Sequence, residues 1–190
     1  MQHPRVLAFV GMPGAGKGTC TDYAAQKYTM PLVHFGTMVY EEVQRRGLDN
    51  VADEKFVRED MRAQEGPAVL AKRVALKAQE ALKAGAKGVV LDGLYSWSEF
   101  KYLREVFGDS LTMIAVVAPR AERYRRAAAR KDSHRQYTTA QIEARDIAEI
   151  ENLEKGGPIA FADYTLLNDS TPETLLAQLD TVLAALGFAA

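Results

Sequence analysis

A glycine-rich segment with one lysine has the residue types and spacing of a phosphate-binding loop. It reads Gly11-Met-Pro-Gly-Ala-Gly-Lys-Gly-Thr19, follows the apolar run Val6–Val10 and precedes a helical pattern, which is the context that such a loop requires. Glycines let backbone N–H groups converge on a phosphate, and a helix N-terminus adds partial positive charge. Lys17 would reach the β- and γ-phosphates of a nucleotide. We expect ATP to be bound by Gly11, Gly14, Ala15, Gly16, Lys17, Gly18 and Thr19.

A carboxylate at the end of another apolar run is the second candidate group. Asp92 follows Val89-Val90-Leu91 and precedes Gly93. A carboxylate at the end of a buried strand is costly unless it meets a cation or hydrogen-bond donors, and ligands of open α/β sheets bind at the carboxyl ends of strands. We predict that Asp92 lies beside the phosphate acceptor and orients Mg²⁺-bound water. The alternative is a turn cap, because Asp-Gly is also a turn signal.

Arginines recur at helical spacing after the apolar run Leu111–Val117. Arg123, Arg126 and Arg130 are placed at i, i+3 and i+7, which is one stripe of a helix. A stripe that faces a phosphate site would stabilise the transferring phosphoryl group, whereas the alternative is a solvated helix face. We predict that Arg123 binds ATP and that Arg126 and Arg130 act in catalysis.

Charge is uneven along the chain although the total is nearly balanced. The 24 Lys and Arg residues against 25 Asp and Glu residues give a net charge of −1, which does not favour a nucleic-acid-coating or membrane-coating role. Residues 120–135 hold seven Lys or Arg against two acids, and residues 141–155 hold five acids against two bases. The basic block predicts either an anion site or a solvated helix face.

Short apolar runs alternate with helical patterns along the whole chain, which predicts βαβ units and a parallel sheet covered on both faces. The expected strands are Val6–Val10, Pro31–Phe35, Gly88–Leu91, Leu111–Val117 and Tyr164–Leu167. The expected helices are Lys17–Tyr28, Met38–Arg46, Glu54–Gln64, Pro67–Ala84, one that follows a capping box at Ser96–Glu99, and one that begins at Thr171-Pro172.

Length and composition indicate one globular domain. The 190 residues, 47% of them hydrophobic and 26% charged, suit a single domain over residues 1–190. One cysteine, Cys20, excludes an internal disulfide and a multi-cysteine zinc site, and we expect it to be a buried small hydrophobe. No apolar run approaches the roughly 18 residues that span a membrane. We expect a soluble cytoplasmic protein that binds neither nucleic acid nor membrane.

The loop has a feature that points to a family. Gly18 stands directly after Lys17, where the general motif has Ser or Thr, and this form resembles the adenylate-kinase group of P-loop nucleoside monophosphate kinases. The resemblance implies a three-layer P-loop fold with strand order 2-3-1-4-5. It also implies that Thr19 meets a donor phosphate and the metal, and that Arg145 is a second catalytic lid arginine. Asn168 falls in the loop beside the base.

Other segments extend the resemblance. Arg62-Ala-Gln-Glu-Gly-Pro67 and Ala71-Lys-Arg73 look like an adenylate-kinase-related group of P-loop proteins known mainly from archaea, and the resemblance supplies no substrate for that group. The segment Ala162–Asn168 is also similar to dephospho-coenzyme A kinases. The resemblance implies an acceptor-binding segment at about residues 36–66 and a short lid at about residues 120–146.

The chain departs from adenylate kinases on the acceptor side. Thr37 replaces an aspartate, Tyr40 replaces an arginine, Leu94-Tyr-Ser96 replaces Phe-Pro-Arg, and Phe100 replaces a glutamine that reads adenine. Two arginines that bind the acceptor phosphate are therefore absent from their usual places. The acceptor-side candidates are Thr37, Arg58, Arg62, Arg73 and Asp92.

These arginines also have a purely structural interpretation. Arg58 and Arg62 are four residues apart, so one helix face would present both, but they would also serve as surface residues beside Glu54 and Glu59.

We expect an ATP- and Mg²⁺-dependent kinase of a small phosphorylated acceptor, with nucleoside and deoxynucleoside monophosphates first. The open alternatives are a dephospho-coenzyme A kinase-like activity and a slow nucleotide-dependent switch NTPase. The sequence leaves the oligomeric state open.

Overall fold

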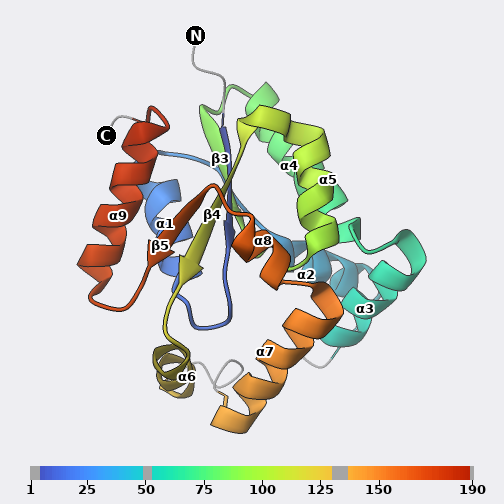
Figure 1. Ribbon diagram of the computed structural model, residues 1–190. Helices are drawn as coiled ribbons and strands as arrows, with labels where there is room; N and C mark the ends of the chain where they lie inside the picture. Colours follow the sequence, from blue (N-terminus) through green and yellow to red (C-terminus); the bar gives the residue numbers. More distant parts are fainter. Residues whose placement is uncertain (1–4, 49–52, 130–136, 189–190) are drawn as a thin grey trace.

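A five-stranded parallel sheet forms the centre of the molecule (Figure 1). The computed structural model describes residues 5–48, 53–129 and 137–188. The strands are β1 Arg5–Val10, β2 Leu32–His34, β3 Gly88–Asp92, β4 Leu111–Val117 and β5 Tyr164–Leu167. Their order is β2-β3-β1-β4-β5 and every neighbouring pair is parallel. The predicted topology and fold class are confirmed.

Helices connect the strands, as the alternating pattern predicted. They are α1 Lys17–Lys27, α2 Phe35–Arg45, α3 Glu54–Glu65, α4 Val69–Lys83, α5 Trp97–Phe107, η1 Gly108–Ser110 (a 3₁₀ turn), α6 Arg120–Ala128, α7 Thr139–Leu153, α8 Gly156–Ala160 and α9 Pro172–Ala185. The helix expected over Met38–Arg46 begins at Phe35, because β2 is only three residues long and the buried Phe35 side chain turns back onto the core. The short α8 was not predicted, since Gly156-Gly157-Pro158 resembles a loop.

Alternate residues of the central strands feed two separate cores. On β1, Val6, Ala8 and Val10 pack into the core with α2, α3, α4 and α5. Leu7 and Phe9 pack into the core with α1 and α9 on the other face, and Figure 1 shows these two helices on the side opposite α4 and α5. Two buried faces explain why the strand sequences are continuously apolar.

Helices α6 and α7 lie beyond the carboxyl end of β4, where Figure 1 shows them below its arrowhead. The chain leaves β4 into α6, and the backbone N–H of Asn168, directly after β5, donates to the Val117 carbonyl at 2.7 Å. The loop after β1, Asp92 at the end of β3 and helices α6 and α7 therefore share one edge of the sheet, which is where ligands bind in this architecture.

Local signals in the sequence shape the termini of elements. The predicted capping box is present: the Ser96 hydroxyl accepts from the Glu99 N–H, and the Glu99 carboxylate accepts from the Ser96 N–H. Gln178 of α9 bonds both the N–H and the carbonyl of Leu167, each at 2.9 Å, which covers one edge of the sheet. Among the described residues, no helix has both the length and the apolar composition of a membrane span.

Candidate functional site

The glycine loop between β1 and α1 takes a backbone shape that requires glycine. Gly14 and Gly16 have φ of +79° and +103°, which side-chain-bearing residues rarely adopt. A Cβ on Gly16 would lie 2.3 Å from Nδ2 of Asn168, and one on Gly14 would lie 2.6 Å from the Arg123 carbonyl oxygen. A Cβ on Gly18 would meet nothing within 4 Å. The loop is therefore tight on its protein side and open at the start of α1.

The loop lysine folds back onto the loop. Lys17 donates from Nζ to the carbonyl of Gly11 at 2.7 Å and to that of Met12 at 3.3 Å. Burial and, next to it, the nearby Lys155 ammonium lower the pKa of Lys17 to about 7, although the Asp92 carboxylate acts in the opposite direction. Anionic phosphates would favour the charged form, so the lysine is suited to a polyanionic ligand.

Two predicted ATP ligands support the loop from behind. Asn168 donates from Nδ2 to the Ala15 carbonyl at 2.8 Å. Arg123 is 7% exposed and donates to the Pro13 carbonyl at 3.0 Å and to the Asp146 carboxylate at 2.7 Å. These contacts join α6, α7 and the loop after β5 to the phosphate loop. Whether Arg123 and Asn168 also touch ATP stays a prediction.

The predicted catalytic arginines are placed differently from one another. Arg126 donates to the Asn168 carbonyl at 3.2 Å, and its buried Nη1 has no hydrogen-bond partner among the described atoms. Arg145 on α7 donates to Glu149 at 2.9 Å and to the Tyr137 hydroxyl at 3.1 Å. Arg130 lies outside the described residues. Both described arginines retain N–H donors for a phosphoryl group.

The predicted metal residues supply oxygen ligands, which Mg²⁺ prefers. Asp92, at the end of β3, bonds His34 at the end of β2 through Oδ2, with 3.1 Å to Nδ1. Its Oδ1 makes no hydrogen bond within the part of the chain that the structure describes. Thr19 is exposed in the first turn of α1. No group of three or more His, Cys, Asp or Glu that could hold a metal occurs among the described residues. The residues present fit an ion held mainly by phosphates and water.

A buried charged cluster lies beside the loop. Lys155 is 1% exposed, its Nζ pairs with Glu149, and it stands 4.6 Å from the centroid of the Tyr95 ring. The charges of Lys155, Glu149 and Arg145 all act on Lys17. Burial raises the pKa of the Tyr95 phenol. The sequence interpretation missed this cluster, and the signal available was a lone lysine before the turn Gly156-Gly157-Pro158.

Two of the acceptor-side arginines are already paired with carboxylates. Arg62 donates to Glu99 at 2.9 Å, and Glu99 is fully buried. Arg73 bonds Glu42 at 3.2 Å and Glu65 at 2.6 Å. The predicted surface neighbours of Arg62, Glu54 and Glu59, are not its partners. Contact of Arg62 or Arg73 with an acceptor stays a prediction, and it would require leaving these carboxylates.

Arg58 and Thr37 are not held in this way. Within the described ranges no carboxylate forms an ion pair with Arg58, and its charge acts on the Tyr95 phenol. Thr37 is exposed on α2. Arg58 is therefore the acceptor-side arginine most free to bind an anion.

Comparisons with known proteins show which family the chain belongs to. A family model described as an AAA domain matches residues 10–143. A UPF0200 protein of Pyrococcus abyssi is 30% identical over 180 residues, which cover 94% of this chain and 95% of the relative. A UPF0200 protein of Methanothrix thermoacetophila is 32% identical over 186 residues, covering 96% and 98%. The chain carries an AAA domain and belongs to the UPF0200 family.

One relative is longer than this UPF0200 protein. The UPF0200/UPF0201 protein of Archaeoglobus fulgidus is 33% identical over 184 residues, and the match covers 96% of this chain but only 56% of that relative. The resemblance to adenylate-kinase-related P-loop proteins is thus confirmed at the level of the family.

Solved structures show the fold of this UPF0200 chain to be that of P-loop kinases. TT1252 from Thermus thermophilus has a TM-score of 0.68 at 22% identity, covering 96% of this chain and 98% of that one. A shikimate kinase from Bacteroides thetaiotaomicron has a TM-score of 0.60 at 13% identity, with the same coverage. A gluconokinase from Sinorhizobium meliloti has a TM-score of 0.58 at 15% identity, covering 99% and 98%. At these identities the likeness concerns the fold.

Proposed function

We propose that this UPF0200 protein is an ATP-dependent phosphotransferase that acts on a small molecule. The observation that carries the proposal is the surplus of cations around the loop. Lys17, Lys155 and Arg145, with Arg62 beside them, outnumber the acidic charges of the site, which are Asp92, Glu149 and Glu99. Such an arrangement favours a polyanion such as a nucleoside triphosphate.

The residues have separate tasks in this proposal. The loop N–H groups and the N-terminus of α1 hold the β- and γ-phosphates. Lys17 exchanges its bonds to the carbonyls of Gly11 and Met12 for phosphate oxygens. Mg²⁺, when bound, neutralises phosphate charge, and Asp92 orients its water. Arg145 and Arg126 donate to the transferring group, whose charge is spread over several oxygens.

We further propose a nucleoside or deoxynucleoside monophosphate as the first acceptor class, bound on the side of α2 and α3. Arg58 supports this choice because it can pair with a phosphate without leaving a buried carboxylate. Guanidinium groups bind phosphate through paired N–H donors. Dephospho-coenzyme A remains the second acceptor to test.

A different class of function has its own supporting observation. Arg62 and Arg73 are committed to Glu99 and Glu42, which leaves fewer cations for an acceptor phosphate. That pattern favours a nucleotide-dependent switch that hydrolyses ATP slowly and uses the acceptor side to bind a partner.

One experiment separates the two functions. ADP release from Mg·ATP is measured with AMP, CMP, UMP, GMP, their deoxy forms and dephospho-coenzyme A, with product detected by chromatography. Lys17→Ala serves as the blank, Arg58→Ala probes the acceptor side, and Lys101→Ala, exposed on α5, is the control. Strong stimulation by one acceptor, lost in Lys17→Ala and with a raised acceptor KM in Arg58→Ala, supports the kinase. A flat profile with slow hydrolysis that depends on Lys17 supports the switch.

A further inference from the structure

Lys155 is a buried cation that binding of the loop phosphates does not explain. It is 1% exposed and lies between α7 and α8, where Glu154 turns the chain with φ of +51°. Its backbone N–H donates to the Glu149 carbonyl at 3.2 Å, and its Nζ pairs with the carboxylate of the same residue. The Tyr95 ring covers it at 4.6 Å. The ammonium cannot leave its place without losing both the Glu149 carboxylate and the Tyr95 ring.

Two cations that differ in solvent exposure share the Glu149 carboxylate. Lys155 takes Oε2, and Arg145 donates from Nε to Oε1 at 2.9 Å. The Arg145 side chain is 35% exposed, whereas the Glu149 side chain is 8% exposed. Two cations therefore neutralise one buried carboxylate, and the more exposed cation is the one on the lid helix.

The sharing decides how readily Arg145 can move. If Arg145 were the sole partner of Glu149, its departure would leave a buried carboxylate without a counter-ion, which is strongly unfavourable. With Lys155 in place, Glu149 keeps a counter-ion when Arg145 leaves, so the departure breaks one ion pair without leaving a buried carboxylate unpaired. Its other contacts, with the Tyr137 hydroxyl and ring, are to a neutral group.

We propose that Lys155 is a positioning residue that keeps Glu149 neutralised, so that Arg145 is free to bind the terminal phosphate of ATP. The inference rests on the proposed function only in taking Arg145 as a ligand of that phosphate. It assigns to Lys155 no contact with the nucleotide. Glu99, fully buried on α5, is the other acidic charge that acts on Lys155.

The test compares affinities for two nucleotides that differ by the terminal phosphate. Calorimetry with Mg²⁺ gives Kd for ADP and for the non-hydrolysable β,γ-imido analogue of ATP. The variants are Lys155→Met, Glu149→Gln, Lys155→Met with Glu149→Gln, and Arg145→Ala. Lys101→Met is the surface control.

The ratio of the two affinities is the expected readout. Lys155→Met lowers affinity for the ATP analogue about tenfold more than affinity for ADP, which corresponds to about 1.4 kcal/mol. Arg145→Ala lowers the ratio of the two affinities by the same factor. The double variant has no buried carboxylate to neutralise, so the ratio returns to within about threefold of wild type. Adding Arg145→Ala to the double variant lowers the ratio of the two affinities again.

Several results would overturn the proposal. Equal losses for ADP and the ATP analogue in Lys155→Met would mean a purely structural role, as would a double variant no better than the single one. An Arg145→Ala variant with an unchanged ratio would also refute it. If Lys155→Met does not fold, Lys155→Gln, which also removes the charge, takes its place in the same comparison. The proposed function fails separately, when wild type shows the ratio but phosphorylates no acceptor.

Discussion

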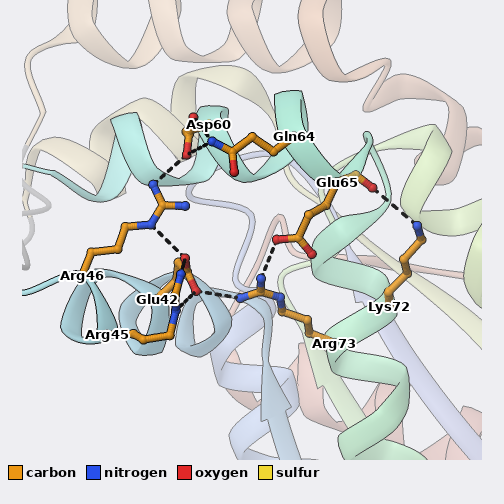
Figure 2. A network of polar contacts seen from close by, with 8 residues as sticks. All are labelled: Glu42, Arg45, Arg46, Asp60, Gln64, Glu65, Lys72 and Arg73. Atoms are coloured by element: carbon orange, nitrogen blue, oxygen red, sulfur yellow. Dashed lines mark hydrogen bonds and ion pairs between the residues drawn. The ribbon is translucent and has the colours of Figure 1, made fainter.

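The stability of the acceptor side should depend on Glu42, a buried carboxylate of α2 that joins three helices (Figure 2). Glu42 is 4% exposed and accepts hydrogen bonds from Arg45, Arg46 and Arg73. Arg46 also bonds Asp60 of α3 at 2.6 Å, and Arg73 of α4 also bonds a carboxylate of α3. Removing the charge with Glu42→Gln therefore weakens the joint between α2, α3 and α4.

The magnitude follows from the exposure of each partner. Arg45 is 71% exposed, so its pair contributes almost nothing. Arg46 at 21% and Arg73 at 31% exposure each make a charge-assisted bond, worth about 1.5 kcal/mol at the lower end of the usual range. Because glutamine keeps one acceptor oxygen and both arginines keep a second carboxylate, we expect a loss of about 2 kcal/mol. For a chain of 190 residues that lowers Tm by roughly 4–8 °C.

The stability difference between wild type and Glu42→Gln should also depend on pH. Hydrogen bonds from Arg45, Arg46 and Arg73 hold the pKa of Glu42 far below its usual range, and water screens the bond from the exposed Arg45 most strongly. A carboxyl whose pKa is lower in the folded state stabilises the protein fully above its unfolded pKa, near 4.3, and loses that contribution as pH falls toward the folded value. The difference in unfolding free energy between wild type and Glu42→Gln should be constant from about pH 8 to 5 and shrink below about pH 4.

Urea unfolding at several pH values measures this difference. Glu41→Gln is the matched control, because Glu41 is the neighbouring residue, is 51% exposed and pairs with the partly exposed Lys77, so its loss should stay below about 0.5 kcal/mol. A Glu42→Gln variant as stable as this control would refute the reasoning. A difference that does not change between pH 7 and pH 3.5 would show that charge is not its source.

Three further outcomes are expected. Gly16→Ala should lower Tm and nucleotide affinity, because its φ of +103° and the amide 2.3 Å from the new Cβ exclude a side chain, whereas Gly18→Ala, with open space around it, should leave Tm unchanged or higher. Binding of Mg·ATP between about pH 7 and 9 should take up a proton at Lys17, whose pKa of about 7 rises beside phosphates. Calorimetry in buffers of different ionisation enthalpy measures this proton uptake, and Lys17→Met should abolish it. Arg62→Met should cost about 3–5 kcal/mol by urea unfolding, because Glu99 is fully buried, and adding Glu99→Gln should recover most of the loss. Unchanged stability with a raised acceptor KM would instead make Arg62 an acceptor ligand.

The parts of the fold that the sequence predicts are those that depend on neighbours in the chain. The glycine loop stands between a strand and a helix as its residues predict, and the capping box at Ser96–Glu99 forms as its spacing predicts. The apolar runs at Leu111–Val117 and Tyr164–Leu167 match strands residue for residue. Such features are fixed by contacts within a few residues, so a single sequence contains them.

The charged contacts of the site depend on residues far apart in the chain. Arg62 and Glu99 are separated by 37 positions, and no helical spacing rule relates them. Asn168 reaches Ala15 across 153 positions. The burial of Lys155 likewise follows from where α7, α8 and Tyr95 meet. Residue types predicted that arginines would matter here, but the choice of partner is made by tertiary packing.

The two sides of the site differ in how their cations are balanced, and this difference has a consequence for binding. On the side of α2 and α3, Arg62 pairs with the buried Glu99, and Arg73 pairs with the buried Glu42 and the exposed Glu65, before any ligand binds. Beside the loop, carbonyls accept hydrogen bonds from Lys17, and burial together with the Lys155 ammonium lowers its pKa. Repulsion among cations is relieved when a polyanion binds, so the donor nucleotide should stabilise the folded protein more than the acceptor does. The chain thus uses its carboxylates to fix the helices of the acceptor side and leaves positive charge where phosphates are expected.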